Sequence, residues 1–354
     1  MLAPPAVAVE TPVALPPSEG PPVPHIALLL PLKSAVFGAA ADAVWQGFLA
    51  AANLKKLGVP IRAYSDIDEN SNVVATYRQA IANGAVAVVG PLTRNGVAAL
   101  AAEPNIPIPT LALNMVEGQA ARQLYFFGMS VEAEARRVAQ LAKQQKLQQA
   151  IVIATRAQLS QRMQVAFEEA WHAGGGTILR EIEFNDDSSV LADITYTPDT
   201  VVFLAVNAAK SRLIRPYLAN KFPVYATSQI FVGNSNTLTN YDLNGIHFVD
   251  VPWLLQPDHP AVMIYPRANP PLPIDRERLY ALGIDAYRLT QLLLTNRIDT
   301  ALPLDGVSGN IRLQEQVFLR EPMSAVFQQG QAQLSDATSL MVPEVFPARI
   351  ITVP

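Results

Sequence analysis

Short apolar runs alternate with stretches of helical periodicity along this chain from about residue 25 onward. The first run, residues 25–30 (HIALLL), is apolar throughout, as expected for a strand buried on both faces. A helix follows it, because the large apolar side chains between Trp45 and Ala52 recur at the spacing i, i+3, i+4, i+7. This alternation of strand and helix predicts a parallel sheet with helices on both faces.

Two series of such units follow one another. In the first we expect a helix at 70–82 and strands at 25–30, 61–64, 86–89, 110–113 and 124–127. In the second, which begins with a helix capped by Ser130, we expect strands at 150–154, 178–184, 201–204, 224–226 and 246–249. A long helix through 279–293 and hairpin strands at 306–313 and 317–319 complete the pattern, which weakens after about residue 331. The two series predict an α/β protein with two doubly wound parallel-sheet lobes.

The chain is expected to cross between the two lobes near Gly128 and again near Val251. The expected divisions are a Pro-rich linker (1–24), a first lobe (25–128 plus 253–318), a second lobe (129–252 plus 319–335) and a tail (336–354). The linker has no Lys or Arg and is expected to be extended. It suggests that an export signal, an anchor or another domain has been removed from in front of it, and a short solvated tail is the alternative.

Composition narrows the class of protein. Of the 354 residues, 50% are hydrophobic and 16% are charged, which favours a large core and excludes disorder for most of the chain. The net charge is −4 and no run of Lys or Arg occurs, which argues against nucleic acid as a partner. The absence of cysteine excludes disulfides and thiolate chemistry and fits an oxidising compartment. No stretch has the length and apolarity of a membrane span.

The turn after the predicted strand at 86–89 is the most informative local feature. Gly90 and Pro91 end the strand, and Thr93 is positioned to cap the next helix. Because ligands of open α/β sheets bind beyond the carboxyl ends of the strands, free amides at this helix start are placed to meet an anion or a carbonyl. The alternative is that the turn only connects two elements.

The same rule, applied to every predicted strand, selects ten cleft candidates: Lys33, Ser34, Thr93, Arg94 and Asn114 from the first lobe, and Thr155, Arg156, Ser228, Gln229 and Asp250 from the second. Hydroxyl groups and amides can hold a carboxylate while Asp250 meets an ammonium group, as in a receptor for an amino acid or a peptide. The three basic residues instead favour an anionic ligand, or a cleft partly filled by its own side chains. A surface or structural role is the alternative for each residue taken singly.

Signatures of catalysis are missing from the sequence. It contains no GxSxG elbow, HExxH, P-loop or GxGxxG motif. The four histidines are scattered, and no pair has the spacing of metal ligands. We therefore predict no enzymatic activity, no metal and no cofactor.

Seven segments in order resemble the C-terminal module of the LppC family. They are IALLLPL (26–32), VGPL (89–92), LALN (111–114), YFFGMSVEAEA (125–135), NGIHFVDVPWL (244–254), RLYALGIDAYRL (278–289) and LDGVSGNIRL (304–313). The resemblance spans roughly residues 25–330 and implies the type I periplasmic-binding-protein fold.

The resemblance also implies a periplasmic, non-enzymatic module that binds a class A penicillin-binding protein, stimulates it and thereby regulates peptidoglycan synthesis. The helical-repeat domain and the lipobox cysteine of the long family members are missing from this chain. Tethering to the outer membrane is therefore expected only through an N-terminal anchor of the full-length protein. The alternative function is a solute-binding receptor of an ABC importer, with an amino acid, a peptide or a related small anion in the inter-lobe cleft.

Overall fold

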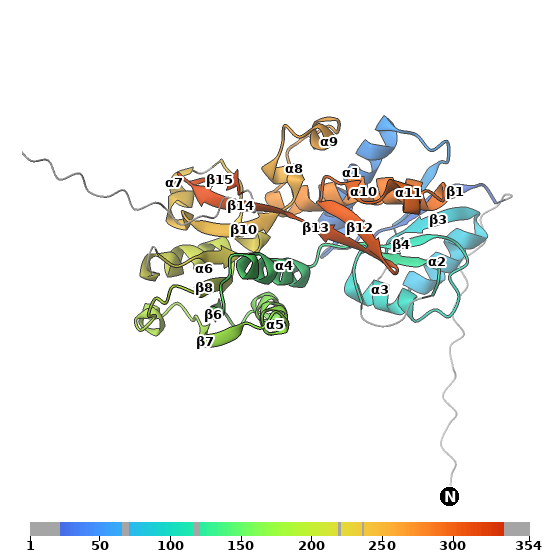
Figure 1. The fold of residues 1–354 in the computed structure, drawn as a ribbon. Helices are drawn as coiled ribbons and strands as arrows, with labels where there is room; N and C mark the ends of the chain where they lie inside the picture. Colours follow the sequence, from blue (N-terminus) through green and yellow to red (C-terminus); the bar gives the residue numbers. More distant parts are fainter. Residues whose placement is uncertain (1–21, 66–70, 117–120, 219–220, 236, 336–354) are drawn as a thin grey trace, which may run out of the picture.

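The computed structural model describes residues 22–65, 71–116, 121–218, 221–235 and 237–335, which form two lobes side by side (Figure 1). Each lobe is built on one sheet. The tail expected at 336–354 and the Pro-rich segment up to residue 21 lie outside the described residues. Among the described helices, none combines the length and the apolarity needed to cross a membrane.

The first lobe, hereafter lobe 1, contains an eight-stranded sheet in the order β11-β12-β13-β5-β4-β3-β1-β2. The strands β1 to β5 and β13 run parallel, and β11 and β12 add an antiparallel edge. The strand bounds are β1 His25–Leu29, β2 Ile61–Tyr64, β3 Ala85–Val89, β4 Thr110–Ala112, β5 Leu124–Phe126, β11 Leu304–Asp305, β12 Asn310–Gln314 and β13 Val317–Glu321.

The second lobe, hereafter lobe 2, repeats this plan with a seven-stranded sheet in the order β15-β14-β10-β9-β8-β6-β7. Its five parallel strands have the same spatial order as β1 to β5, and β14 and β15 are antiparallel. The bounds are β6 Gln149–Ala154, β7 Thr177–Glu183, β8 Thr200–Ala205, β9 Val224–Ala226, β10 Ile246–Asp250, β14 Met323–Gln328 and β15 Gln331–Leu334. The predicted fold class of two doubly wound parallel sheets is thereby confirmed.

Helices cover both faces of each sheet, so each sheet separates two apolar clusters. In lobe 1, α1 and α10 pack on one face and α2 and α3 on the other. In lobe 2, α4 and α5 cover one face and α6 lies on the other. The helix bounds are α1 Gly38–Leu54, α2 Val73–Ala82, α3 Arg94–Ala101, α4 Val131–Gln144, α5 Gln158–Ala173, α6 Ala208–Ile214, α7 Thr237–Asn240, α8 Pro252–Leu255, α9 Pro260–Met263, α10 Ile274–Leu294 and α11 Ile298–Ala301.

The helices α1 and α10 cross at two glycines. A Cβ atom on Gly47 would lie 1.9 Å from the carbonyl oxygen of Tyr280, and one on Gly283 would lie 2.1 Å from that of Val44. Neither position can hold a side chain at this separation, so the two glycines let the backbones come into direct contact.

Within the described residues, the chain passes between the lobes three times: after β5, after β10 and between β13 and β14. The strand β13 runs to Glu321 in the sheet of lobe 1, beyond the expected division at residue 318, and β14 starts at Met323 in the sheet of lobe 2. Only Pro322 separates the two strands, which follow one another across the middle of the molecule (Figure 1).

Candidate functional site: the inter-lobe cleft and the hinge

A cleft of about 720 Å³ lies between the lobes, where the rule for open sheets places a ligand. Lobe 1 lines it with the turn after β3, the residue after β4 and apolar side chains of α1 and α10, and lobe 2 lines it with the starts of α4 and α5. Three of the ten sequence candidates, Thr93, Arg94 and Asn114, are in its lining.

The turn after β3 has the local structure that the sequence predicts. The hydroxyl of Thr93 accepts a hydrogen bond from the N–H of Gly96 at 3.2 Å and caps α3. Gly90 has φ +104°, and a Cβ atom there would lie 2.1 Å from the carbonyl oxygen of Leu29. Asn114 donates from Nδ2 to the carbonyl of Leu92 at 3.0 Å and so ties the turns after β3 and β4 together. The lobe 1 wall is therefore held by side-chain-to-backbone hydrogen bonds within lobe 1 and by the close backbone approach at Gly90.

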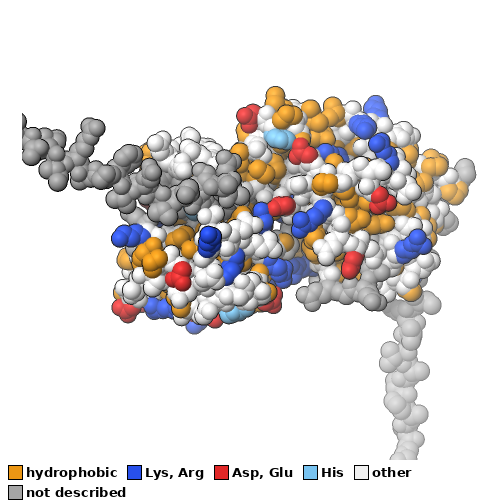
Figure 2. All heavy atoms as spheres, viewed as in Figure 1, with side chains coloured by type: hydrophobic (Ala, Val, Ile, Leu, Met, Phe, Trp, Pro, Cys, Tyr) orange, Lys and Arg blue, Asp and Glu red, His pale blue; other side chains and the backbone are white. Residues whose placement is uncertain are grey.

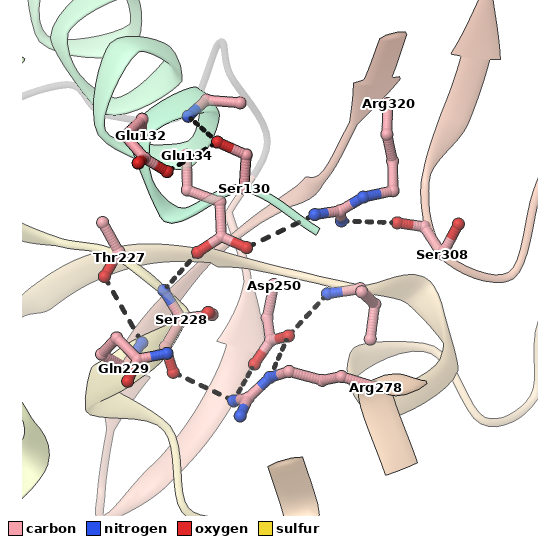
Figure 3. Close-up of polar contacts among 12 residues, drawn as sticks. Ser130, Glu132, Glu134, Thr227, Ser228, Gln229, Asp250, Arg278, Ser308 and Arg320 are labelled. Carbon is pink, nitrogen blue, oxygen red and sulfur yellow. Dashed lines mark hydrogen bonds and ion pairs between the residues drawn. The ribbon is translucent and has the colours of Figure 1, made fainter. Parts of the chain in front are cut away.

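Glu132 joins the two walls of the cleft. Its Oε1 lies 2.6 Å from Nη2 of Arg94 on α3 and 2.7 Å from Nε of Arg162 on α5. Its Oε2 accepts a hydrogen bond from the hydroxyl of Ser130 at 2.8 Å, and Ser130 also caps α4 by accepting from the N–H of Ala133 (Figure 3). Burial raises the pKa of Glu132, but its backbone N–H, Ser130 and the two arginines outweigh burial and lower that pKa to about 2.

Four further candidates lie outside the cleft lining. Lys33 is exposed, and the hydroxyl of Ser34 accepts from the N–H groups of Val36 and Phe37 in the turn before α1. Thr155 donates its N–H to Ser160 at 2.7 Å. Arg156 is 83% exposed and pairs with Glu183 at 2.6 Å. These side chains and backbone groups serve local structure or the surface.

The last three candidates, Ser228, Gln229 and Asp250, belong to a buried polar network at the passage between the lobes (Figure 3). The carboxylate of Asp250 is fully buried and receives two hydrogen bonds from Arg278, Nε to Oδ1 at 2.9 Å and Nη2 to Oδ2 at 2.7 Å. The same Nη2 donates to the carbonyl of Ser228 at 2.9 Å. Gln229 donates its N–H to the hydroxyl of Thr227 at 3.4 Å.

A second ion pair completes this network. The Oε1 of Glu134 lies 3.5 Å from Nη2 of Arg320, with both side chains at most 5% exposed, and Oε2 accepts from the N–H of Ser228 at 3.1 Å. Burial raises the pKa of Glu134, although Arg320 acts in the opposite direction. We call Glu134, Asp250, Arg278 and Arg320 the hinge network. Its acids come from lobe 2 and its arginines from lobe 1, so its ion pairs join the two lobes.

The arrangement limits what the cleft can bind. Asp250 cannot meet an incoming ammonium group while Arg278 occupies its carboxylate and protein surrounds it. In the cleft itself, two arginines share one carboxylate, which leaves a net positive charge. Among the described residues, no group of three or more His, Asp or Glu side chains could hold a metal ion.

The sequence rule did not select Glu132, Arg162, Arg278 or Arg320. One signal for Arg278 was present: it shares the spacing i, i+4, i+7, i+11 with Leu282, Asp285 and Leu289 on α10, and all four are buried. Charged residues in register with a buried apolar stripe indicate an internal ion pair. No local signal marks Glu132 beyond its place in the first turn of α4.

Comparisons of this chain with known proteins identify a family and several relatives. The family model described as "LppC putative lipoprotein" matches residues 14–330. A penicillin-binding protein activator LpoA from Photobacterium profundum is 26% identical over 346 residues, which cover 86% of this chain and 56% of the relative. The chain spans about half the length of the curated relatives that it matches.

Two solved structures share the fold over most of the chain. A putative branched-chain amino acid ABC transporter from Chromobacterium violaceum superimposes with a TM-score of 0.75 at 37% identity, covering 86% of this chain and 100% of that one. The C-domain of LpoA (YraM) from Haemophilus influenzae, described as a regulator of PBP1A, superimposes with a TM-score of 0.75 at 23% identity, covering 88% and 100%.

Proposed function

This chain belongs to the LppC family, and from that premise we propose that it is a periplasmic, non-enzymatic module that regulates a class A penicillin-binding protein by protein–protein contact. Curated relatives that carry the name penicillin-binding protein activator LpoA support the choice of partner. Tethering to the outer membrane in the full-length protein is part of the proposal, and the family description as a lipoprotein supports it.

The observation that carries this proposal is the internal pairing of the hinge network, in which Arg278 occupies the buried carboxylate of Asp250. In a receptor for amino acids, a carboxylate without another charged partner is well suited to bind the ammonium group of the ligand. Here the candidate for that role, Asp250, is sealed beneath Arg278, and Ser228 contributes backbone groups to the same network. The geometry therefore favours contact with a protein over recognition of a zwitterion in the cleft.

The test is a binding titration of the purified chain with the class A penicillin-binding protein of the same organism. We expect saturable binding and a faster rate of glycan polymerisation or peptide cross-linking by the synthase. An unrelated protein of similar size and charge serves as the control in both assays. Absence of binding at micromolar concentrations contradicts the proposal.

A second candidate function, solute binding, is favoured by the cleft volume of about 720 Å³ and by the relative from Chromobacterium violaceum. Its net positive charge favours a small anion as the solute. A thermal-shift screen against small anions, amino acids, short peptides and muropeptide fragments tests it, because a ligand that binds only the folded state stabilises that state by RT ln(1 + L/Kd), where L is the free ligand concentration. A shift that Arg94→Ala abolishes supports this candidate, and a flat screen removes it.

A further inference from the structure

A second concave surface lies on the outside of lobe 1, away from the inter-lobe cleft. It is a groove of about 450 Å³ between the end of α1, the second half of α10 and the segment that follows α9. We call it the α1–α10 groove. It shares no lining residue with the cleft, so a partner in the groove leaves the cleft untouched. Its volume lies within the range of pockets that bind small molecules, so it is large enough for a few side chains of a partner.

Apolar side chains are exposed along the rim of this groove. Leu54 at the end of α1 and Ile264 after α9 line it, and each is 54% exposed. Met263, next to Ile264, is 64% exposed. Figure 2 shows hydrophobic side chains gathered over the upper part of this lobe, around α8 and α9. Single exposed apolar residues are ordinary, but several around one groove mark an interaction surface.

The charge of the groove differs from the charge of the molecule. The chain as a whole carries −4, whereas the described residues that line the groove include Lys55 and Arg288 and no carboxylate. Arg288 already pairs with Asp285 at 2.9 Å, so Lys55, which is exposed, is the groove's available cation. Asp305 is next to the lining residue Leu304 in the sequence. Its Oδ2 lies 3.9 Å from Nε2 of His259. A partner segment that complements this surface carries apolar side chains and at least one carboxylate.

The groove is preformed rather than loosely arranged. The carbonyl of Lys55 at the end of α1 accepts hydrogen bonds from the hydroxyl of Tyr287 at 2.5 Å and from Nε2 of Gln291 at 3.2 Å. The contact of α1 with α10 at Gly47 and Gly283 fixes the two helices behind it. Little ordering is needed when a partner binds, which favours affinity.

We propose that the α1–α10 groove is the docking site for a segment of the class A penicillin-binding protein in which apolar side chains flank a carboxylate. This inference rests on the proposed function, because the partner is the one named there. Leu54 and Ile264 are the apolar anchors, and Lys55 pairs with the carboxylate.

The experiment measures the dissociation constant of the complete chain with the purified synthase for two groove variants and two matched controls. Ile264→Glu places a charge on the apolar rim, and Lys55→Glu reverses the cation. Leu238→Glu, at a position 84% exposed on α7, and Lys221→Glu, also exposed, make the same changes on lobe 2. We expect the dissociation constant to rise about tenfold or more for Ile264→Glu and about threefold or more for Lys55→Glu. The controls should stay within about twofold of wild type.

The outcomes are separable. Unchanged melting temperatures show that all four variants fold. If wild type binds and both groove variants bind equally well, the docking site is elsewhere and the inference is overturned while the proposed function stands. If wild type itself does not bind, the proposed function has failed and the inference falls with it. If the wild-type chain self-associates, and Ile264→Glu abolishes this self-association but not binding to the synthase, then a second copy of the chain occupies the groove. That result also overturns the inference.

A photo-cross-linking side chain in place of Met263 tests the chemistry of the occupant directly. Cross-links should map to a segment of the synthase with apolar and acidic residues. Cross-links confined to a basic segment contradict the proposal even if the binding data agree with it.

Discussion

Arg278 and Asp250 form a bidentate ion pair across the boundary between the lobes, and their side chains are only 6% and 0% exposed, respectively. The same arginine also donates to the carbonyls of Ser228 and Phe231, both at 2.9 Å. Because both charges are out of water, each is tolerated only while the other is present.

Removing one member of this pair should be costly. Asp250→Asn or Arg278→Ala is expected to lower the free energy of unfolding by about 3–5 kcal/mol, because a buried charge loses its partner. Urea denaturation at neutral pH measures the loss. Asp275→Asn is the matched control: Asp275 binds the same arginine at 2.6 Å but is 87% exposed, so about 1 kcal/mol or less is expected. Equal losses for Asp250→Asn and Asp275→Asn would contradict this account.

Glu132 should make the protein sensitive to acid. Its pKa falls from 4.5 to about 2 on folding, so its stabilising effect is complete above about pH 4.5 and is lost as the pH falls toward 2. Glu132→Gln should therefore be less stable than wild type at neutral pH, with the difference shrinking between pH 4.5 and 2. Thermal melts across that range measure it. If the melting temperatures of wild type and Glu132→Gln change in parallel with pH, the two arginines do not lower the pKa of Glu132. Glu169→Gln, which removes an exposed pair with Arg136, is the control and should change stability by about 0.5 kcal/mol or less.

His247 should make the stability of the protein depend on pH in a higher range than Glu132 does. Burial lowers its pKa from 6.5 to about 4, and its Nδ1 has no hydrogen-bond partner in the described part of the chain. Between these values the unfolded chain binds a proton that the folded protein does not, so stability falls as the pH drops from 6.5 to 4. The total loss is as much as about 3 kcal/mol. His247→Gln should remove this slope in chemical denaturation at a series of pH values, and an unchanged slope would mean that another group causes it.

The crossing of α1 and α10 should reverse the usual preference for alanine in helices. Gly47→Ala adds a Cβ atom 1.9 Å from the carbonyl oxygen of Tyr280, so it should destabilise the protein by about 2 kcal/mol or more. In an unpacked helix the same change stabilises by up to about 1 kcal/mol. Gly174→Ala is the control, since its Cβ atom would have no neighbour nearer than 3.5 Å. A neutral Gly47→Ala variant would show that the helices can separate.

Features that depend on neighbouring residues were predictable from the sequence. Thr93 and Ser130 cap the helices that follow them, as their position before an amphipathic stretch indicates. Most of the parallel strands were found because they are short apolar runs, whereas β2 and β7 include exposed charged residues. The strand β15, by contrast, has the pattern exposed, intermediate, exposed, exposed over Gln331–Leu334. An edge strand of this kind has no apolar alternation to reveal it.

The site depended on contacts that sequence spacing does not encode. Asp250 is the last residue of β10, at the carboxyl end that the rule selects, yet its partner Arg278 is 28 residues away on α10. Which polar groups face the cleft and which face each other is decided by the docking of the lobes. The rule therefore found the right edge of each sheet, but only Thr93, Arg94 and Asn114 among its ten candidates line the cleft.

The single residue between β13 and β14 governs how the two halves of the molecule can move. Pro322 has its φ angle fixed by its ring, so little torsional freedom is left between two strands that are each hydrogen-bonded into a sheet. Bending at this point must disturb the pairing of β13 or β14, each of which lies inside its sheet with a neighbouring strand on both sides. The proline therefore restricts bending at this passage between the lobes to the remaining backbone angles next to it.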